Sequence, residues 1–583
     1  MCGYRSVFDG VLLKISKITA IPNFRHLTFV YEHNHKTLMK ITLAQLNYHI
    51  GNFDKNYELI SDAISKALSE NSDLIVFGEL STTGYPPRDF LEFSDFIDRS
   101  DELLDKIMAL STDIGIIVGA PSRNPKVEGK DLFNSAYFFS GGETLRIHHK
   151  TLLPTYDIFD EYRYFEPSYD FQLVEFKGKK IALTVCEDIW NIGNENPLYP
   201  ICPLDEMVPL GPDFIINISA SPFSVNHAEA RKQIVRDNVN RYQVPMIYVN
   251  HVGAQTEILF DGGSLVAGAN GNIYKELPYF EEAVETVDLN DVMTSDREAP
   301  QIDDNLREMH DAVVMGVRDY FGKLGFTQAI LGLSGGIDSA VTAVIAARAL
   351  GGENVRGVLM PSQFSSDHSV SDAEQLAKNL NMPYDIIPIA KVYKAFDEAL
   401  TPAFVGTEFN VTEENIQARI RGVLNMAISN KFGNILLNTS NKSEMAVGYG
   451  TLYGDLCGGL SVIGDIYKTD VYRLAEYINK DGVVIPVNTI TKPPSAELRP
   501  NQKDSDSLPD YAILDEILYE YIENKKGPKE IMALGHEEAL VKRILRMVNI
   551  NEFKRYQTAP TLRVSSKSFG VGRRLPIVAK YLS

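Results

Sequence analysis

The stretch Leu331-Gly332-Leu333-Ser334-Gly335-Gly336-Ile337-Asp338-Ser339-Ala340 decides the fold of the second half of the chain. The apolar run 329–333 predicts a buried parallel strand, and the run 340–350 predicts the helix that carries the chain back. Residues 334–339 are therefore the expected turn from strand to helix. Its two glycines let a ligand approach the backbone, and its amides and hydroxyls face an anion at the positive end of the helix. The sequence predicts a phosphate-binding turn.

This turn is not the common nucleoside-triphosphate loop, because the Gly-Lys-Ser/Thr that closes that motif is missing. Asp338 lies near the place of the lysine, and an acidic side chain beside a phosphate needs a metal ion between them. The alternative is an ordinary glycine turn, against which the full hexapeptide weighs. Ser-Gly-Gly-Ile-Asp-Ser resembles the signature of the ATP pyrophosphatases, which cleave ATP to AMP and pyrophosphate while adenylating a substrate.

Composition limits the classes of protein that fit. The chain of 583 residues has room for two or three domains, and its hydrophobic residues, 44% of the total, form no run long enough to span a membrane. Its net charge of -20 disfavours nonspecific binding to nucleic acid. The four cysteines lack the paired spacing of a metal site. We expect a soluble cytoplasmic protein with neither a nucleic-acid nor a membrane partner.

Residues 1–38 carry scattered basic residues and no apolar core followed by small residues, so they do not resemble a secretory signal. We expect a dispensable N-terminal extension, either disordered or the product of an upstream start, and an added helix or strand is the alternative. Folding is expected to begin at Met39, with a strand over 40–46 and a helix over 56–68.

Three strands of the first half are expected to end at a reactive side chain. Glu79 follows the run 74–78, Lys150 follows two histidines, and Cys186 follows the run 181–185. Each alone is weak evidence, because such residues are usually solvated or packed in a core. Together they can cleave an amide: Glu79 would take the proton of the Cys186 thiol as it attacks the amide carbon, and Lys150 would stabilise the oxyanion.

This trio, with its surroundings, resembles the carbon-nitrogen hydrolase (nitrilase) superfamily over about residues 39–289. The resemblance implies a four-layer α-β-β-α sandwich. It also implies a glutamine site, because Ser221 and Tyr156 match residues that hold glutamine in glutamine-hydrolysing members. His227 stands where such enzymes tend to carry a basic residue, and a histidine is only partly charged at neutral pH. Either His227 or Arg231 is therefore expected to serve as the basic glutamine contact.

The second half alternates strands and helices after a polar linker over 290–304. Strands are expected over 355–361 and 384–389 and a helix over 371–380, which predicts a doubly wound, Rossmann-like parallel sheet over 305–583 with its ligand at the carboxyl ends of the strands. A further helix is expected after 410, with a threonine cap. The segment 492–510, rich in Pro, Asp and Ser, is expected to be a mobile lid.

With the glycine turn, the stretches that follow resemble the NAD synthetases over about residues 301–583. The resemblance assigns an ATP site, with Mg²⁺ as cofactor, to Ser334, Gly335, Gly336, Ile337, Asp338, Ser339, Thr439, Lys468 and Ser495. It assigns the magnesium ligands to Asp338 and Glu444, and the deamido-NAD site to Asn415, Arg419, Glu444 and Lys554. Leu452 and Gly459 depart from the single-domain, ammonia-using form, which has a lysine and an aspartate there.

The whole chain after the extension thus resembles the glutamine-dependent NAD synthetase family. That resemblance implies a homo-oligomer that adenylates deamido-NAD with ATP and amidates it with ammonia from glutamine. One alternative is another glutamine-driven adenylating ligase with a different acid, against which the stretches around Asn415, Glu444 and Lys554 argue. The other is a catalytically silent nucleotide-binding protein, which is expected to have lost a member of the trio or Asp338. The sequence leaves the size of the oligomer and the route of ammonia open.

Overall fold

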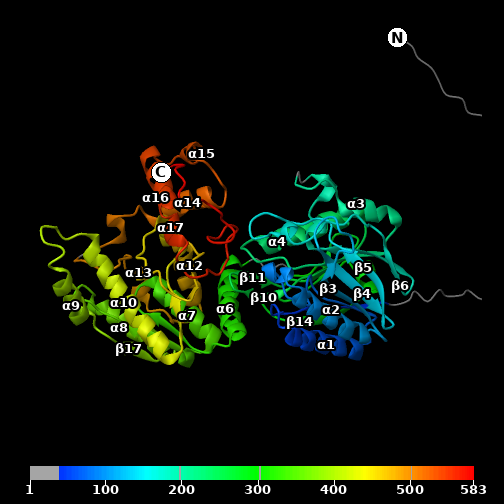
Figure 1. Cartoon of the computed structure of the whole chain (residues 1–583), viewed down its shortest axis with the longest axis horizontal. Coiled ribbons are helices and arrows are strands. Elements are labelled where there is room, and N and C mark those ends of the chain that lie inside the picture. The colour runs from blue at the N-terminus through cyan, green and yellow to red at the C-terminus, as the bar shows by residue number, and fades with distance from the viewer. Residues whose placement is uncertain (1–38, 196–197, 301–303, 501, 583) are drawn as a thin grey trace, which may run out of the picture. The chain divides into compact units, whose positions relative to one another are not determined.

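The computed structural model describes residues 39–195, 198–300, 304–500 and 502–582. The predicted extension over 1–38 lies outside this part of the chain. Elements are labelled in Figure 1, which runs from blue at the first residues to red at the last. The bounds of the two predicted domains stay a prediction, and we refer below to the first half, up to Asp288, and to the second half, from Asp304.

The first half contains two six-stranded mixed sheets. One has the order β14 (Ala283–Asp288), β1 (Lys40–Gln45), β2 (Leu74–Val76), β3 (Gly115–Arg123), β4 (Leu132–Ser140) and β5 (Glu143–His149). The other has the order β13 (Ile273–Glu276), β12 (Leu265–Ala267), β9 (Met246–Val249), β8 (Phe214–Ile218), β7 (Lys179–Val185) and β6 (Val174–Phe176). A short hairpin, β10 (Val252–Gln255) and β11 (Ile258–Asp261), stands beside them.

These sheets face each other across an apolar core and are covered outside by helices. Ile41, Val76 and Ile117 of the first sheet pack with Leu183 and Ile216 of the second. Helices α1 (Phe53–Ser69) and α2 (Ser94–Ala109) bury their apolar sides on the outer face of the first sheet, and α3 (Pro203–Met207) and α4 (His227–Tyr242) on that of the second. The predicted four-layer α-β-β-α sandwich is confirmed.

The second half is built on a five-stranded parallel sheet. Its order is β17 (Tyr384–Ile386), β16 (Val355–Leu359), β15 (Ala329–Gly332), β18 (Ile435–Asn438) and β19 (Leu460–Ser461). Helices α6 (Asn305–Leu324), α7 (Ile337–Leu350), α8 (Asp367–Asn379) and α12 (Lys468–Ile478) share the core on one face, and α10 (Val411–Phe432) packs on the other. The chain reverses its direction of winding between β15 and β18, so the predicted doubly wound sheet is confirmed. Such a reversal opens a crevice at the carboxyl ends of the strands.

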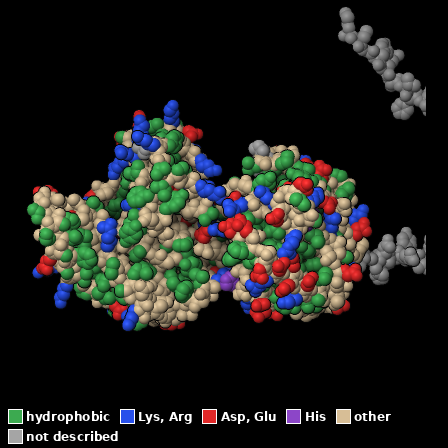
Figure 2. Space-filling view, in the orientation of Figure 1, with side chains coloured by type: hydrophobic (Ala, Val, Ile, Leu, Met, Phe, Trp, Pro, Cys, Tyr) green, Lys and Arg blue, Asp and Glu red, His purple; other side chains and the backbone are tan. Residues whose placement is uncertain are grey.

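The remaining helices extend this half. Four of them, α11 (Lys442–Val447), α14 (Tyr511–Ile522), α15 (Pro528–Met532) and α16 (Glu538–Ile550), share an apolar cluster of their own. The others are α9 (Ala390–Leu400), α13 (Val487–Thr491) and α17 (Glu552–Arg555), while α5 (Leu289–Thr294) follows β14 and continues into the predicted linker. Figure 2 shows acidic side chains gathered over the first half on the face drawn, in keeping with the net negative charge.

The start of α10 corrects one expectation. Asn410, and not a threonine, caps the helix: its side chain accepts a hydrogen bond from the Thr412 amide, and the Asn410 amide donates one to the Glu413 carboxylate. Asparagine caps at least as well as threonine, so the sequence left the choice between neighbours open. The helix after β16 also begins earlier than predicted, at Asp367.

Candidate active sites

Glu79 and Lys150 meet in a fully buried position of the first half. The Lys150 ammonium lies 2.7 Å from Glu79 Oε1, and neither side chain is exposed. Glu79 follows β2 and also accepts hydrogen bonds from Asn134 Nδ2 at 2.7 Å and from the Ala220 amide at 3.0 Å. These contacts fix the carboxylate in one orientation, as a positioned base requires.

Cys186 stands at the sharp end of β7. Its φ of 45° lies in the left-handed region that side chains other than glycine rarely adopt, and such strain concentrates at functional sites. The Asp188 carboxylate holds the turn, accepting the amides of Val185 at 3.0 Å, Thr151 at 3.0 Å and Leu152 at 2.9 Å. Asp188 thus ties the loop that follows Lys150 to the loop of the thiol.

The pKa values describe a thiol that needs a base. Burial, and then the charge of Glu79, raise the pKa of the Cys186 thiol well above its ordinary value, while Lys150 opposes them. Burial alone would lower the pKa of Lys150, but the carboxylates of Glu161 and Glu79 outweigh it and raise that pKa. Lys150 therefore stays a cation while the thiol stays protonated until its proton is removed.

Glu161 is a member of this site that the sequence did not reveal. Its carboxylate accepts the Lys150 ammonium at 2.8 and 2.9 Å and the Tyr85 hydroxyl at 2.8 Å. Burial raises the pKa of Glu161 to about 7. It lies in a 3-10 turn, Glu161–Arg163, without apolar periodicity, so in sequence it resembles any solvated glutamate.

Two tyrosines converge on Glu187, the neighbour of the thiol. The hydroxyl of Tyr156, a predicted glutamine contact, donates to the Glu187 carboxylate at 3.0 and 3.1 Å, and the Tyr199 hydroxyl donates at 2.8 Å. Burial is the main cause of a raised pKa of Glu187. The structure therefore brings Tyr156 to the Cys186 loop.

Ser221 and His227 also meet, whereas Arg231 points elsewhere. Ser221 Oγ lies 3.2 Å from His227 Nε2, and the histidine ring stacks on Trp190. Burial, Arg231 and Arg563 lower the pKa of His227 to about 3, so the ring is neutral at physiological pH. Arg231 donates to both carboxylate oxygens of Asp261, at 3.0 and 2.7 Å, and neither side chain is exposed. Its guanidinium is thus committed to Asp261.

The predicted phosphate-binding turn lies between β15 and α7. Gly335 has a φ of 80°, and a Cβ atom there would lie 2.2 Å from the Ser369 carbonyl oxygen, so only glycine fits. Ser334 Oγ accepts the Gly336 amide at 3.2 Å and lies 3.0 Å from Ser339 Oγ. The turn therefore has the tight, hydroxyl-lined form expected of an anion cradle.

Beside the turn, two carboxylates share one buried lysine. Lys468 Nζ lies 2.5 Å from Asp338 Oδ2 and 3.6 Å from Glu444 Oε1, and Asn441 donates to Asp338 at 2.9 Å. Burial, and then the Asp338 charge, raise the pKa of Glu444 to about 8, as expected of two carboxylates short of positive charge. One or two carboxylates beside phosphates are the usual protein ligands of Mg²⁺, so this donor set fits that ion. Among the described residues, no group of three or more His, Cys, Asp or Glu side chains is arranged to hold a metal.

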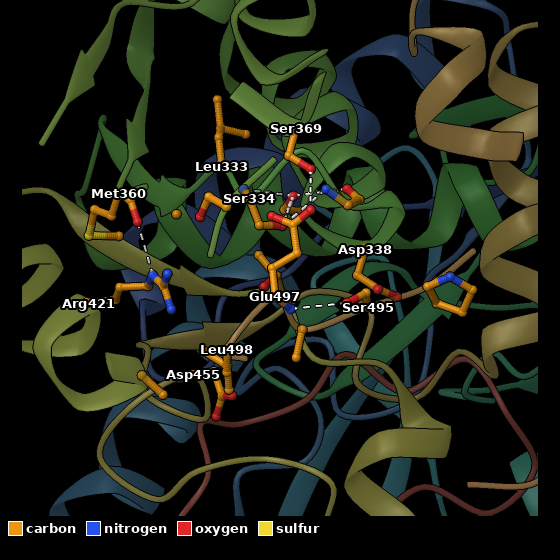
Figure 3. Close-up of a pocket in the computed structure, with 18 of the residues that line it drawn as sticks. Leu333, Ser334, Asp338, Met360, Ser369, Arg421, Asp455, Ser495, Glu497 and Leu498 are labelled. Carbon is orange, nitrogen blue, oxygen red and sulfur yellow. Dashed lines mark hydrogen bonds between the residues drawn. The ribbon is translucent and has the colours of Figure 1, made fainter. Parts of the chain in front are cut away.

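A cavity of about 580 Å³ opens at the carboxyl ends of these strands. Figure 3 shows Ser334, Asp338 and Ser495 around it, and Glu497 reaching from the predicted lid to Ser369. The predicted ATP residues that line it are Ser334, Gly336, Ile337, Asp338, Ser339, Thr439, Lys468 and Ser495, and Glu444 lines it as well. The turn and the predicted lid thus border one cavity.

The other predicted deamido-NAD residues gather at the loop after α11. Lys554 Nζ donates to the carbonyls of Gly448 and Gly450 at 2.7 and 3.0 Å, and Arg419 Nε donates to that of Leu452 at 3.2 Å. Asn415 Oδ1 accepts the Thr451 hydroxyl at 2.7 Å. These side chains hold the loop at the edge of the cavity and do not line it.

Arg421 is a further cation that lines the cavity, in addition to Lys468, and the sequence did not single it out. Its Nε donates to the Met360 carbonyl at 3.1 Å, as Figure 3 shows. Burial is the main cause of a lowered pKa of this guanidinium. Arg421 follows Arg419 by two positions on α10, and side chains two positions apart lie on different faces of a helix. The sequence could therefore have indicated that Arg421 faces a different side from Arg419.

Comparison with known proteins finds a matching family for each half of the chain. A family model described as carbon-nitrogen hydrolase matches residues 40–298, and one described as NAD synthase matches residues 309–558. The chain is 44% identical over 557 residues to a glutamine-dependent NAD(+) synthetase of Synechocystis sp., covering 93% of this chain and 99% of the relative. It is 40% identical over 581 residues to one of Thermotoga maritima, covering 93% and 99%. A solved glutamine-dependent NAD+ synthetase of Acinetobacter baumannii, in complex with adenosine diphosphate, aligns with a TM-score of 0.74 at 37% identity, covering 93% and 98%.

No described helix is long and apolar enough to cross a membrane.

Proposed function

Because this chain belongs to the glutamine-dependent NAD(+) synthetases, we propose that its first half hydrolyses glutamine at Cys186 and its second half amidates deamido-NAD at the 334–339 turn. The enzyme is a ligase that forms a carbon-nitrogen bond with glutamine as amide donor, and its products are NAD, AMP, pyrophosphate and glutamate. We call the two halves the glutaminase half and the synthetase half. The assignment of the steps to residues rests on the geometry of each site.

In the glutaminase half, Glu79 takes the thiol proton as Cys186 attacks the amide carbon of glutamine. Lys150, kept charged by Glu79 and Glu161, stabilises the oxyanion of the tetrahedral intermediate. Glu79 then passes this proton to the amide nitrogen, which leaves as ammonia. Water, with Glu79 again as base, hydrolyses the glutamyl thioester to glutamate and the free Cys186 thiol. Tyr156 and Ser221 hold the glutamine. The observation that carries this proposal is the fully buried contact of Lys150 with Glu79, whose charges both act on the Cys186 thiol.

In the synthetase half, the carboxylate of deamido-NAD attacks the α-phosphorus of ATP, and ammonia then displaces AMP from the adenylated carboxyl. The hydroxyls and amides of the turn, together with Lys468, meet the charge of the leaving pyrophosphate. Asp338 and Glu444 would hold Mg²⁺, which would neutralise phosphate charge when bound. Arg421 presents its charge to the cavity and would pair with an anionic group of the dinucleotide.

The test is NAD formation from deamido-NAD, ATP and Mg²⁺ with either glutamine or ammonium chloride as nitrogen source. Cys186→Ala is expected to lose the glutamine-dependent reaction and to keep the ammonia-dependent one. Cys202→Ala is the matched control, because Cys202 is a buried cysteine whose polar contact is the Tyr242 hydroxyl. Loss of both reactions in Cys186→Ala with the control intact would refute the division of labour, and a wild type that makes NAD from neither source would refute the acceptor.

We also propose a cytoplasmic homo-oligomer. Helices α9 and α10 support an association of subunits, because they expose the apolar side chains of Val392, Phe396, Val411, Val423 and Met426. Sedimentation equilibrium is expected to give a mass that is a multiple of 65.1 kDa. A monomer at micromolar concentration would contradict this proposal.

A further inference from the structure

The α-carboxylate of glutamine lacks an obvious cation in the glutaminase half. A bound amino acid carries a carboxylate that proteins usually pair with a positive charge. His227 beside Ser221 is neutral, and Arg231 is committed to Asp261. Lys150 is surrounded by the carboxylates of Glu79 and Glu161. The positive charge must come from elsewhere.

A strap of the synthetase half, residues 561–568, runs along this site. The Val225 amide, between Ser221 and His227, donates to the Val564 carbonyl at 2.8 Å. Arg563 Nη2 donates to Asp157 Oδ2 at 2.5 Å, and Lys567 Nζ donates to Asp157 Oδ1 at 3.3 Å. Asp157 directly follows Tyr156. The strap therefore touches both loops that carry the proposed glutamine contacts.

These three side chains form a cationic cluster. Two cations, Arg563 and Lys567, share the single carboxylate of Asp157, which leaves a net charge of +1. Arg563 is 7% exposed, so water screens its charge weakly, and that charge is felt at His227. Nη2 makes both hydrogen bonds of the guanidinium, to Asp157 and to the Ser566 carbonyl at 3.1 Å, so Nη1 has no protein partner among the described residues.

The strap is itself held by two buried side chains of the synthetase half, Asp465 and Lys442. The Asp465 carboxylate accepts the amides of Val564 and Ser565 at 2.9 and 2.7 Å. Lys442, at the start of α11, pairs with Asp465 at 2.9 Å and donates to the Lys567 carbonyl at 2.9 Å. Glu444 lies on the same helix. The position of Arg563 is thus fixed by the half of the chain that does not hydrolyse glutamine.

We propose that Arg563 is a positioning residue of the glutaminase site: it lies against the Tyr156 loop at Asp157 and supplies the positive charge that attracts the α-carboxylate of glutamine. This inference rests on the proposed glutaminase function of Cys186. It implies that a residue of the synthetase half strengthens the binding of glutamine in the glutaminase half.

The test compares glutamine with its α-amide, which lacks the carboxylate charge but keeps the bond that is cleaved. For Arg563→Met we expect kcat/KM for glutamine to fall by about tenfold or more, mainly through KM, with the value for the α-amide nearly unchanged. Arg563→Lys keeps the charge and is expected to retain most of the preference for glutamine. Lys567→Met, at a more exposed position, is expected to cause a smaller loss that is again confined to glutamine.

Asp157→Asn separates charge from tethering. It raises the net charge of the cluster, so kcat/KM for glutamine is expected to hold or rise, whereas a mere tether would lose activity on both substrates. Equal losses for the two substrates in Arg563→Met, or no loss for glutamine, would overturn the proposal. Ammonia-dependent NAD formation reports that the synthetase half is folded, and if Arg563→Met lacks it, Lys567→Met and Asp157→Asn decide. A wild type without glutaminase activity would instead refute the proposed function.

Discussion

Replacing Arg231 by Met tests whether this arginine stabilises the glutaminase half or binds glutamine. Both side chains of the Arg231–Asp261 pair are fully buried, and two hydrogen bonds of 3.0 and 2.7 Å join them. Removing the guanidinium leaves a buried carboxylate without a partner, which costs about 3–5 kcal/mol. For a folding unit of this size, a loss of that order lowers Tm by about 6 to 20 °C.

The assay is thermal unfolding followed by fluorescence, with the glutamine KM measured well below the transition. Arg231→Met is expected to lower Tm and to leave the glutamine KM close to that of the wild type. The double variant Arg231→Met/Asp261→Asn removes the orphaned charge and is expected to recover part of the loss. Arg236→Met on the same helix is the matched control, because its pair with Glu298 is partly exposed and worth about 1 kcal/mol or less. An unchanged Tm with a raised glutamine KM would show that Arg231 binds substrate and would refute the reasoning.

Two further predictions concern buried titratable groups. Glu161→Gln removes one of the two carboxylates that keep Lys150 charged. The kcat of the glutamine-dependent reaction is therefore expected to fall by about 10²-fold, while ammonia-dependent synthesis, the control, is unchanged. A decrease in both reactions would contradict a role confined to the glutaminase half. His148 is buried, and neither ring nitrogen has a hydrogen-bond partner among the described residues. Burial is the main cause that lowers its pKa to about 3, so its contribution to stability is present above pH 6.5 and is lost as pH falls toward 3. Between pH 7 and pH 5 this loss amounts to about 2 kcal/mol of the free energy of unfolding. Urea unfolding at the two pH values is expected to show that His148→Leu loses about 2 kcal/mol less than the wild type. An equal loss in both proteins would mean that the ring accepts a proton in the native state.

The sequence was informative where the chemistry is local. The phosphate-binding turn could be predicted because its glycines, serines and aspartate are adjacent and because apolar runs flank it on both sides. Glu79, Lys150 and Cys186 could be singled out because each follows a strand. Glu79 and Lys150 follow β2 and β5 of the first sheet, and Cys186 follows β7 of the second sheet, which faces the first. The alternation of strands and helices likewise indicated the doubly wound sheet, whereas the four-layer sandwich was implied by the resemblance to the carbon-nitrogen hydrolases.

It was uninformative where partners come from distant segments. Nothing near Arg231 shows that Asp261 will neutralise it, so Arg231 remained a candidate glutamine contact. Glu161 matters because of Lys150, and Arg563 because of Asp157 in the other half, and neither has a local pattern. A charged residue in a loop has the same sequence signal whether it is solvated or buried in an ion pair.

The contacts of α6 with the first half form the join between the two halves, and they bear on how ammonia passes from one site to the other. Asp319 Oδ2, on α6, accepts Asn47 Nδ2 at 2.7 Å and the Ala254 amide at 2.8 Å. Lys323, on the same helix, donates to Asn47 Oδ1 and to the carbonyls of Tyr48 and Ala254, at 2.7 to 2.8 Å.

A hinge motion at this join would leave these groups without partners, at about 1–3 kcal/mol for each buried one. Large rotation of one half against the other is therefore a poor way to open a path. Ammonia must stay unprotonated to react, so its route has to be closed to water without such a rotation. Movements of single loops, such as the one at Tyr156 held by Arg563, fit this requirement, because they break one or two ion pairs instead of the whole join.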